Sequence, residues 1–129
     1  MKHLTTLFLL VMVGFSTKAM KPETVITITF SGEKQKTIRA HKGDTLIIKF
    51  QMASGTGFVW QPSGKINLCK QGDTKYEHIK RNLPGAPMWE VMNFIVLSPG
   101  EEDITFVYHR PFEKSMAAAK TRKLHLIVH

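Results

Sequence analysis

Three short segments of the sequence combine turn-forming residues with side chains that commonly make contacts between proteins. The first spans residues 53–60 and reads Ala-Ser-Gly-Thr-Gly-Phe-Val-Trp. Gly55 and Gly57 permit tight or positive-φ conformations and let another molecule approach the main chain closely. Ser54 and Thr56 add small hydroxyl groups that form hydrogen bonds with little steric bulk. This segment favours recognition through its backbone, although an ordinary turn before a strand has the same composition.

Two later segments have the same character. Residues 83–90 combine rigid prolines with Met88 and Trp89, two large apolar side chains that are costly to expose unless they meet a partner or fold back on the core. Residues 108–113 read Tyr-His-Arg-Pro-Phe-Glu, and arginine and aromatic residues are common at the energetic centres of interfaces. Pro111 restricts that segment, so less conformational entropy is lost on binding. The alternative for Arg110 is an ordinary salt-bridged surface position.

The sequence contains one cysteine, Cys69, so no disulfide within the chain is expected. Cys69 and His78 suggest a nucleophile and its base, but spacing alone does not establish the geometry that such a pair needs. Cys69, His78, Met88 and His41 also match the ligand types of a cupredoxin-like copper protein, although the gaps between them are longer than in a compact ligand loop. We expect Cys69 to be a buried structural thiol and the protein not to be an enzyme.

The elements that must position these segments are short runs of β-branched and aromatic residues separated by turn residues. In several runs apolar residues recur at every second position, which indicates strands with one buried face. The expected strands are residues 25–30, 36–39, 46–50, 58–60, 91–96, 104–108 and 124–128. Trp60 is expected in the core. The pattern predicts an all-β fold, an immunoglobulin-like antiparallel β-sandwich of about seven to eight strands.

Two stretches have weaker patterns. Residues 69–82 are polar with little periodicity, so we place them only loosely between strands. Residues 115–120 contain three alanines and are helix-like, but the stretch is too short to be a stable helix alone. We expect it to belong to a long loop.

The first 19 residues predict a secretory signal peptide, with a basic start, an apolar run over residues 4–15 and small residues before a cut near Ala19. The single mature domain would then span residues 20–129. The whole chain carries a formal charge of +8 in scattered positions. For an exported protein, this charge favours solubility and steering towards acidic proteins over binding of nucleic acid.

The order and spacing of the three segments are more specific than any one of them. Thr-Gly-Phe-x-Trp, a Pro/Gly-rich loop closing on Glu90, and Tyr-x-Arg-Pro-Phe together resemble the chagasin-like inhibitors of cysteine proteases over the whole mature domain. In that family the first segment ends in Thr-Thr-Gly-Tyr-x-Trp and the third contains Arg-Pro-Trp. Phe58 and Phe112 therefore stand where the family has tyrosine and tryptophan. Pro87 and Met88 stand where it prefers glycine.

The resemblance implies a reversible, non-covalent inhibitor that occludes the cleft of papain-like, cathepsin-like proteases with three loops. Thr56 and Gly57 match the tip that the family places against the catalytic cysteine and histidine. The residues that would contact the protease are Ser54, Gly55, Thr56, Gly57, Phe58, Gly85, Ala86, Pro87, Met88, Arg110, Pro111 and Phe112.

The inhibitor is expected to act as a monomer without cofactor or metal, and without a nucleic-acid or membrane partner once its leader is removed. It would be secreted or held in lysosome-like or phagosomal vesicles. The broader alternative is an immunoglobulin-like adhesion or recognition module with another protein partner. Substituting Thr56 and Arg110 would leave that function largely intact.

Overall fold

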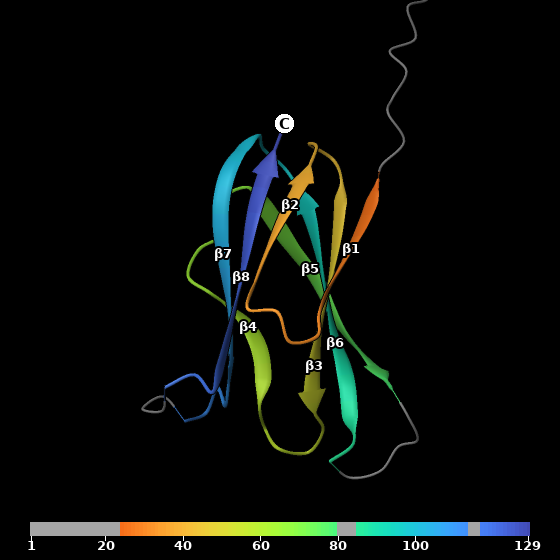
Figure 1. Cartoon of the computed structure of the whole chain (residues 1–129), viewed down its shortest axis with the longest axis vertical. Coiled ribbons are helices and arrows are strands. Elements are labelled where there is room, and N and C mark those ends of the chain that lie inside the picture. The colour runs from red at the N-terminus through yellow and green to blue at the C-terminus, as the bar shows by residue number, and fades with distance from the viewer. Residues whose placement is uncertain (1–23, 80–84, 114–116) are drawn as a thin grey trace, which may run out of the picture.

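A computed structural model describes residues 24–79, 85–113 and 117–129 of the chain. The predicted signal peptide lies outside these residues. The described part contains eight strands and no helix, so no helix there could cross a membrane. The strands are β1 (Val25–Phe30), β2 (Gln35–Ala40), β3 (Thr45–Ala53), β4 (Val59–Ser63), β5 (Cys69–His78), β6 (Pro87–Val96), β7 (Gly100–His109) and β8 (Lys120–Val128) (Figure 1).

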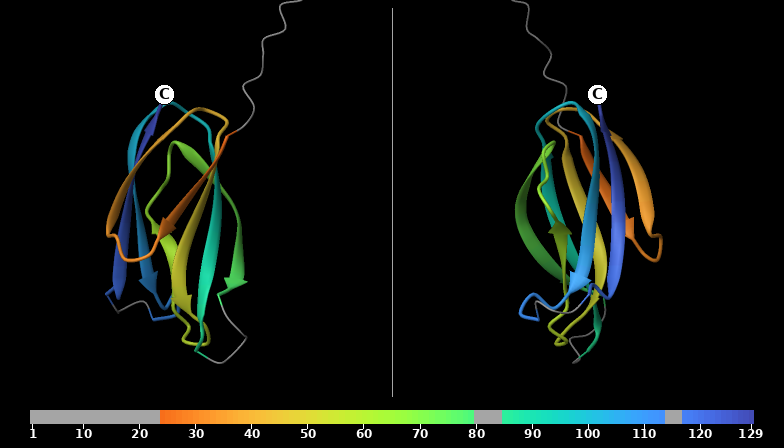
Figure 2. Two further views of the ribbon diagram at one scale, coloured as in Figure 1. Left: turned by 45° about the vertical axis from the view of Figure 1, so that its right-hand side comes forward. Right: turned by 90° about the vertical axis from the view of Figure 1, so that its left-hand side faces the viewer.

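The strands form two four-stranded sheets that face each other as a sandwich (Figure 2). One sheet has the order β1-β3-β6-β5 and the other the order β2-β8-β7-β4. The predicted all-β sandwich of seven to eight strands is therefore confirmed. Its pairing is not wholly antiparallel, because β1 runs parallel to β3 and β2 runs parallel to β8. The chain passes from one sheet to the other between β1 and β2, so each of these strands joins the edge of a different sheet.

The core lies between the sheets and follows the alternation seen in the sequence. Phe50, Phe94 and Phe106 are completely buried, and each such side chain contributes roughly 1.5–3 kcal/mol to folding. A row of rings runs through this core towards one end of the sandwich. Phe50 stacks on Trp60 with ring centroids 4.7 Å apart, and Trp60 stacks on Tyr108 at 4.9 Å. The expectation that Trp60 is a core residue is confirmed.

Four parts of the chain differ from the boundaries expected from sequence. The loosely placed residues 69–82 contain a ten-residue strand, β5, whose residues after Cys69 are exposed on both faces and which bulges between Gln71 and Thr74. Pro87, Met88 and Trp89 belong to β6 rather than to a loop. Phe58 precedes β4 instead of starting it. Lys120, the last residue of the expected helix-like stretch, begins β8.

The connections that follow β3, β5 and β7 all leave from the same end of the sandwich, away from the C-terminus (Figures 1 and 2). This end carries the three segments singled out in the sequence. We call it the loop end, and its opposite the far end. Within these segments we call residues 54–58 the first loop, residues 85–88 the second loop and residues 110–112 the third loop. Residues 87 and 88 of the second loop also open β6.

Candidate functional site

The first loop is held in shape by its own glycines and threonine. Gly55 and Gly57 have φ angles of 75° and 80°, a left-handed conformation that costs other residues roughly 1–2 kcal/mol. The Thr56 hydroxyl donates to the carbonyl of Ala53 at 2.9 Å. At the base of the loop, the amide of Ala53 donates to the hydroxyl of Tyr108 at 3.1 Å. The loop is therefore a preformed turn anchored to the opposite sheet.

The third loop braces the first. Nε of Arg110 donates to the carbonyl oxygen of Thr56 at 3.0 Å, and the guanidinium group lies 4.6 Å from the centre of the Phe58 ring. Glu113 holds the same guanidinium group from the other side, with Nη1 and Oε1 3.3 Å apart. Arg110 thus makes the intramolecular contacts of a salt-bridged residue and at the same time fixes the first loop.

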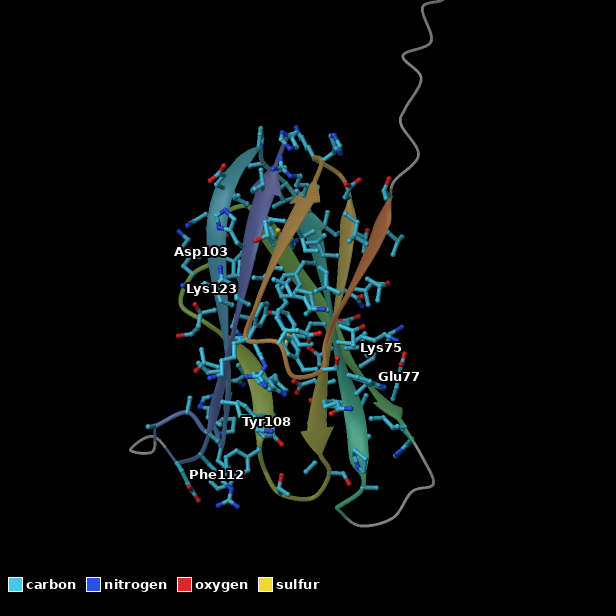
Figure 3. The ribbon with its side chains drawn as sticks, viewed as in Figure 1. Lys75, Glu77, Asp103, Tyr108, Phe112 and Lys123 are labelled. Atoms are coloured by element: carbon cyan, nitrogen blue, oxygen red, sulfur yellow. The ribbon has the colours of Figure 1, made fainter. Side chains whose placement is uncertain are left out.

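Phe112 is the most exposed large apolar side chain of the described residues, with 70% of its surface accessible. Figure 3 shows it at the loop end, farther from the C-terminus than Tyr108. Its ring lies against Gly57, where an added Cβ atom would come within 3.1 Å of two ring carbons. Pro111 beside it is also exposed. An exposed phenylalanine packed on a bare glycine backbone forms a flat apolar surface that is available to a partner.

The second loop joins the same surface from the other side. The amide of Ser54 donates to the carbonyl of Ala86 at 3.2 Å, which links the first loop to the second. Gly85 has a φ of 74° and, like Pro87, is exposed. Met88 is half-buried and lies opposite Met52 in the register of β6 and β3. All three loops are therefore connected into one edge.

Glu90, for which no role was predicted from sequence, supports this edge from inside the sandwich. Its side chain is only 1% exposed, and its carboxylate accepts a hydrogen bond from the amide of Trp60 at 2.9 Å. Burial raises the pKa of Glu90 to about 7. Because β6 and β4 belong to different sheets, this carboxylate ties the sheets together just below the first loop.

The Cys69 alternatives do not fit the fold. Cys69 and His78 are at opposite ends of β5, which places them roughly 30 Å apart at the usual rise of an extended strand. His78 pairs with Met88 at the loop end, whereas Cys69 pairs with Val96 at the far end. Burial, with a smaller effect of Glu102, raises the pKa of the Cys69 thiol to about 11. Neither a catalytic pair nor a Cys-His-Met copper site can form from these residues.

The chain matches the family model described as chagasin family peptidase inhibitor I42 over residues 39–126, more than half of its length. No curated protein matches the sequence significantly. Among solved structures, the cysteine protease inhibitor EhICP2 from Entamoeba histolytica is similar with a TM-score of 0.71 and 15% identity, over 84% of this chain and 99% of that one.

Two further structures have the same fold. Amebosin has a TM-score of 0.62 and 20% identity, over 84% of this chain and 100% of that one. PbICP-C, solved in complex with falcipain-2, has a TM-score of 0.56 and 20% identity, over 81% of this chain and 99% of that one. The match to the family model covers all three loops.

Proposed function

Because the chain belongs to the chagasin family of peptidase inhibitors, and is an inhibitor of cysteine proteases rather than an enzyme, we propose that its three loops occlude the active-site cleft of papain-like enzymes. The solved complex of the similar protein PbICP-C with falcipain-2 supports a protease of that class as the partner. The predicted contact residues remain those of the three loops, from Ser54 to Phe58, from Gly85 to Met88 and from Arg110 to Phe112.

The observation that carries this proposal is that the three loops are braced to one another before any partner binds. Arg110 holds the carbonyl of Thr56, the ring of Phe112 covers Gly57, and Ser54 is bonded to Ala86. Loops that are already ordered lose little conformational entropy on docking, so a standard-sized interface can bind tightly.

The same bracing explains how a loop can lie in a protease cleft without being cut. Peptide hydrolysis needs the scissile carbonyl in a near-attack position relative to the catalytic thiolate. The left-handed φ angles of Gly55 and Gly57 and the hydrogen bond from Arg110 to Thr56 hold this backbone in a turn, away from that extended position. The inhibition would therefore be reversible and non-covalent.

The proposal also includes export. The basic start and apolar run within residues 1–19 support a cleaved signal peptide, and the charge of +8 supports steering towards acidic partners. The mature inhibitor would then act as a monomer in the secretory pathway, either outside the cell or in lysosome-like or phagosomal vesicles that hold papain-like proteases.

Titration of several papain-like proteases with the mature protein tests the proposal. We expect inhibition constants of about 10 nM or below, full recovery of activity on dilution, and recovery of the intact inhibitor. A serine protease serves as the control enzyme and should be unaffected. Absence of inhibition of every papain-like enzyme at micromolar concentration would refute the proposal.

A further inference from the structure

Strand β8 begins with two cations on the face that, farther along the strand, is buried in the core. Lys120 and Arg122 alternate in phase with the buried Leu124, Leu126 and Val128, and their partners on β7 are the buried Tyr108 and Phe106. They remain open to solvent because the outer strands do not cover this part of the sandwich. Strand β1 pairs with β3 only as far as Phe50, and β2 pairs with β8 only from Lys123 onwards (Figure 1).

The uncovered side forms a cleft that runs into the loop end. It consists of two adjoining hollows of about 280 and 120 Å³, which share Gln51 and Lys120. The larger hollow is also lined by Ala53, Gly85, Pro87 and Tyr108, and the smaller one by Phe30, Trp60 and Arg122. The cleft therefore has an aromatic floor and two basic side chains, and its outer end is bounded by residues of the second loop. We call it the cationic cleft.

The two cations of the cleft differ from the other cations that lie over aromatic rings. Lys36 and Arg110 each have a carboxylate partner, Glu33 at 4.0 Å and Glu113 at 3.3 Å. Lys120 lies 5.7 Å from the ring centre of Tyr108, and Arg122 lies 5.6 Å from that of Trp60. Within the described residues, neither has a carboxylate within 4.0 Å. Their charges are thus available to an anion from outside.

We infer that the cationic cleft receives a carboxylate-bearing segment of the inhibited protease, and that Lys120 and Arg122 help to decide which enzymes are bound tightly. This inference rests on the proposed function. A protease seated on the second loop also covers the outer end of the cleft, because Gly85 and Pro87 belong to both. A guanidinium group favours a carboxylate through paired hydrogen bonds, and the apolar floor strengthens the attraction by excluding water.

The test compares two doubly substituted inhibitors of equal net charge against the papain-like protease that the wild type binds most tightly. K120Q/R122Q removes both cations of the cleft, and we expect its inhibition constant to rise about tenfold, chiefly through faster dissociation. K42Q/K70Q removes two exposed cations at the far end and should change the constant by less than about twofold. K120R/R122K keeps both charges but moves the guanidinium group away from position 122, so its inhibition constant should lie between those of the wild type and K120Q/R122Q. Added salt should reduce the difference between the inhibition constants of K120Q/R122Q and the wild type.

Thermal unfolding shows whether each variant is folded. If K120Q/R122Q is less stable than its control, K120Q alone serves instead, since Lys120 is exposed at the first position of β8, and a rise of about threefold is expected. Equal inhibition by K120Q/R122Q and K42Q/K70Q would overturn the role of the cleft and leave the proposed function standing. Failure of the wild type itself to inhibit any papain-like protease would overturn both.

Discussion

At the far end of the sandwich the turns are held by main-chain hydrogen bonds and by the carboxylates of Asp44 and Glu102, whereas at the loop end the first and third loops are joined by a guanidinium group and an aromatic ring. At the far end, the amide of Gly43 donates to Val96 at 2.8 Å and that of Val96 to Asp44 at 2.9 Å. At the loop end, the contacts come from the guanidinium group of Arg110 and the ring of Phe112. Single substitutions at the loop end should therefore change inhibition more than they change stability.

The largest effect on inhibition is expected when two glycines with nearly the same backbone conformation are each replaced by alanine. Gly57 and Gly64 have φ angles of 80° and 85°, so G57A and G64A should each lose about 1 kcal/mol of unfolding free energy. Only at Gly57 would the new methyl group meet the Phe112 ring and change the surface offered to the protease. We expect the inhibition constant of G57A to rise about 100-fold, which corresponds to ~2.7 kcal/mol. Similar inhibition constants for G57A and G64A would contradict the role of the first loop.

The next effect concerns the arginine that braces the first loop. R110A removes the hydrogen bond to Thr56 and the cover of the Phe58 ring, and we expect its inhibition constant to rise about 30-fold because the loop must then be ordered on binding. R39A is the matched control, since Arg39 is an exposed arginine that contacts His129 at the far end. Titration of one papain-like protease with both variants makes the comparison. The bracing role fails if both inhibit as the wild type does.

A smaller effect is expected at the exposed ring of the third loop. F112A should weaken inhibition about tenfold while stability changes by less than about 0.5 kcal/mol, because the side chain is 70% exposed in the free protein. I95A is its control, since Ile95 is 48% exposed on β6, away from the loops. Inhibition assays and chemical denaturation of both variants measure the two quantities. A large loss of stability in F112A without loss of inhibition would show that this ring is structural.

The smallest effect on inhibition is expected at Glu90, whose substitution should instead change the pH dependence of stability. The pKa of Glu90 is raised from 4.5, the ordinary value of a glutamate side chain, to about 7 in the folded protein. Between these values the folded state binds more protons than the unfolded state, so this group's stabilisation is complete below about pH 4.5 and is lost as pH rises through 7. The change should be on the order of 1–3 kcal/mol.

E90Q should remove this dependence of the unfolding free energy on pH, which chemical denaturation between pH 4.5 and 7.5 measures. It should inhibit within about threefold of the wild type, because the amide oxygen of glutamine can still accept the hydrogen bond of Trp60. If the unfolding free energy of E90Q depends on pH as that of the wild type does, another group titrates in this range.

Much of the fold could be predicted from sequence because one face of most strands is buried. Strands such as Val25–Phe30 and Gly100–His109 alternate visibly for this reason. Strand Cys69–His78 could not be recognised in the same way, because it is an edge strand with polar residues on both faces. The parallel pairing of β1 with β3 and of β2 with β8 could not be predicted from the residue pattern either, because it depends on where the chain crosses between the sheets.

The site was predictable only in part. The order of the three loop segments indicated which residues would gather, but the contacts among them join residues that are far apart in the chain. Arg110 and Thr56 are 54 positions apart, and no local pattern encodes their hydrogen bond. Glu90 had one signal that could have revealed it, since it lies in phase with the inward-facing Met92, Phe94 and Val96. A carboxylate at such a position needs a buried hydrogen-bond donor, and here this is the amide of Trp60.

The most direct test of the central claim is to record the backbone amide signals of the ¹⁵N-labelled inhibitor with and without a papain-like protease whose catalytic cysteine is replaced by serine. We predict that signals from all three loops change together, including Gly57, Ala86 and Phe112, while those of the far-end residues Gly43 and Leu97 do not. Changes confined to one loop, or centred on the far end, would contradict a joint binding edge.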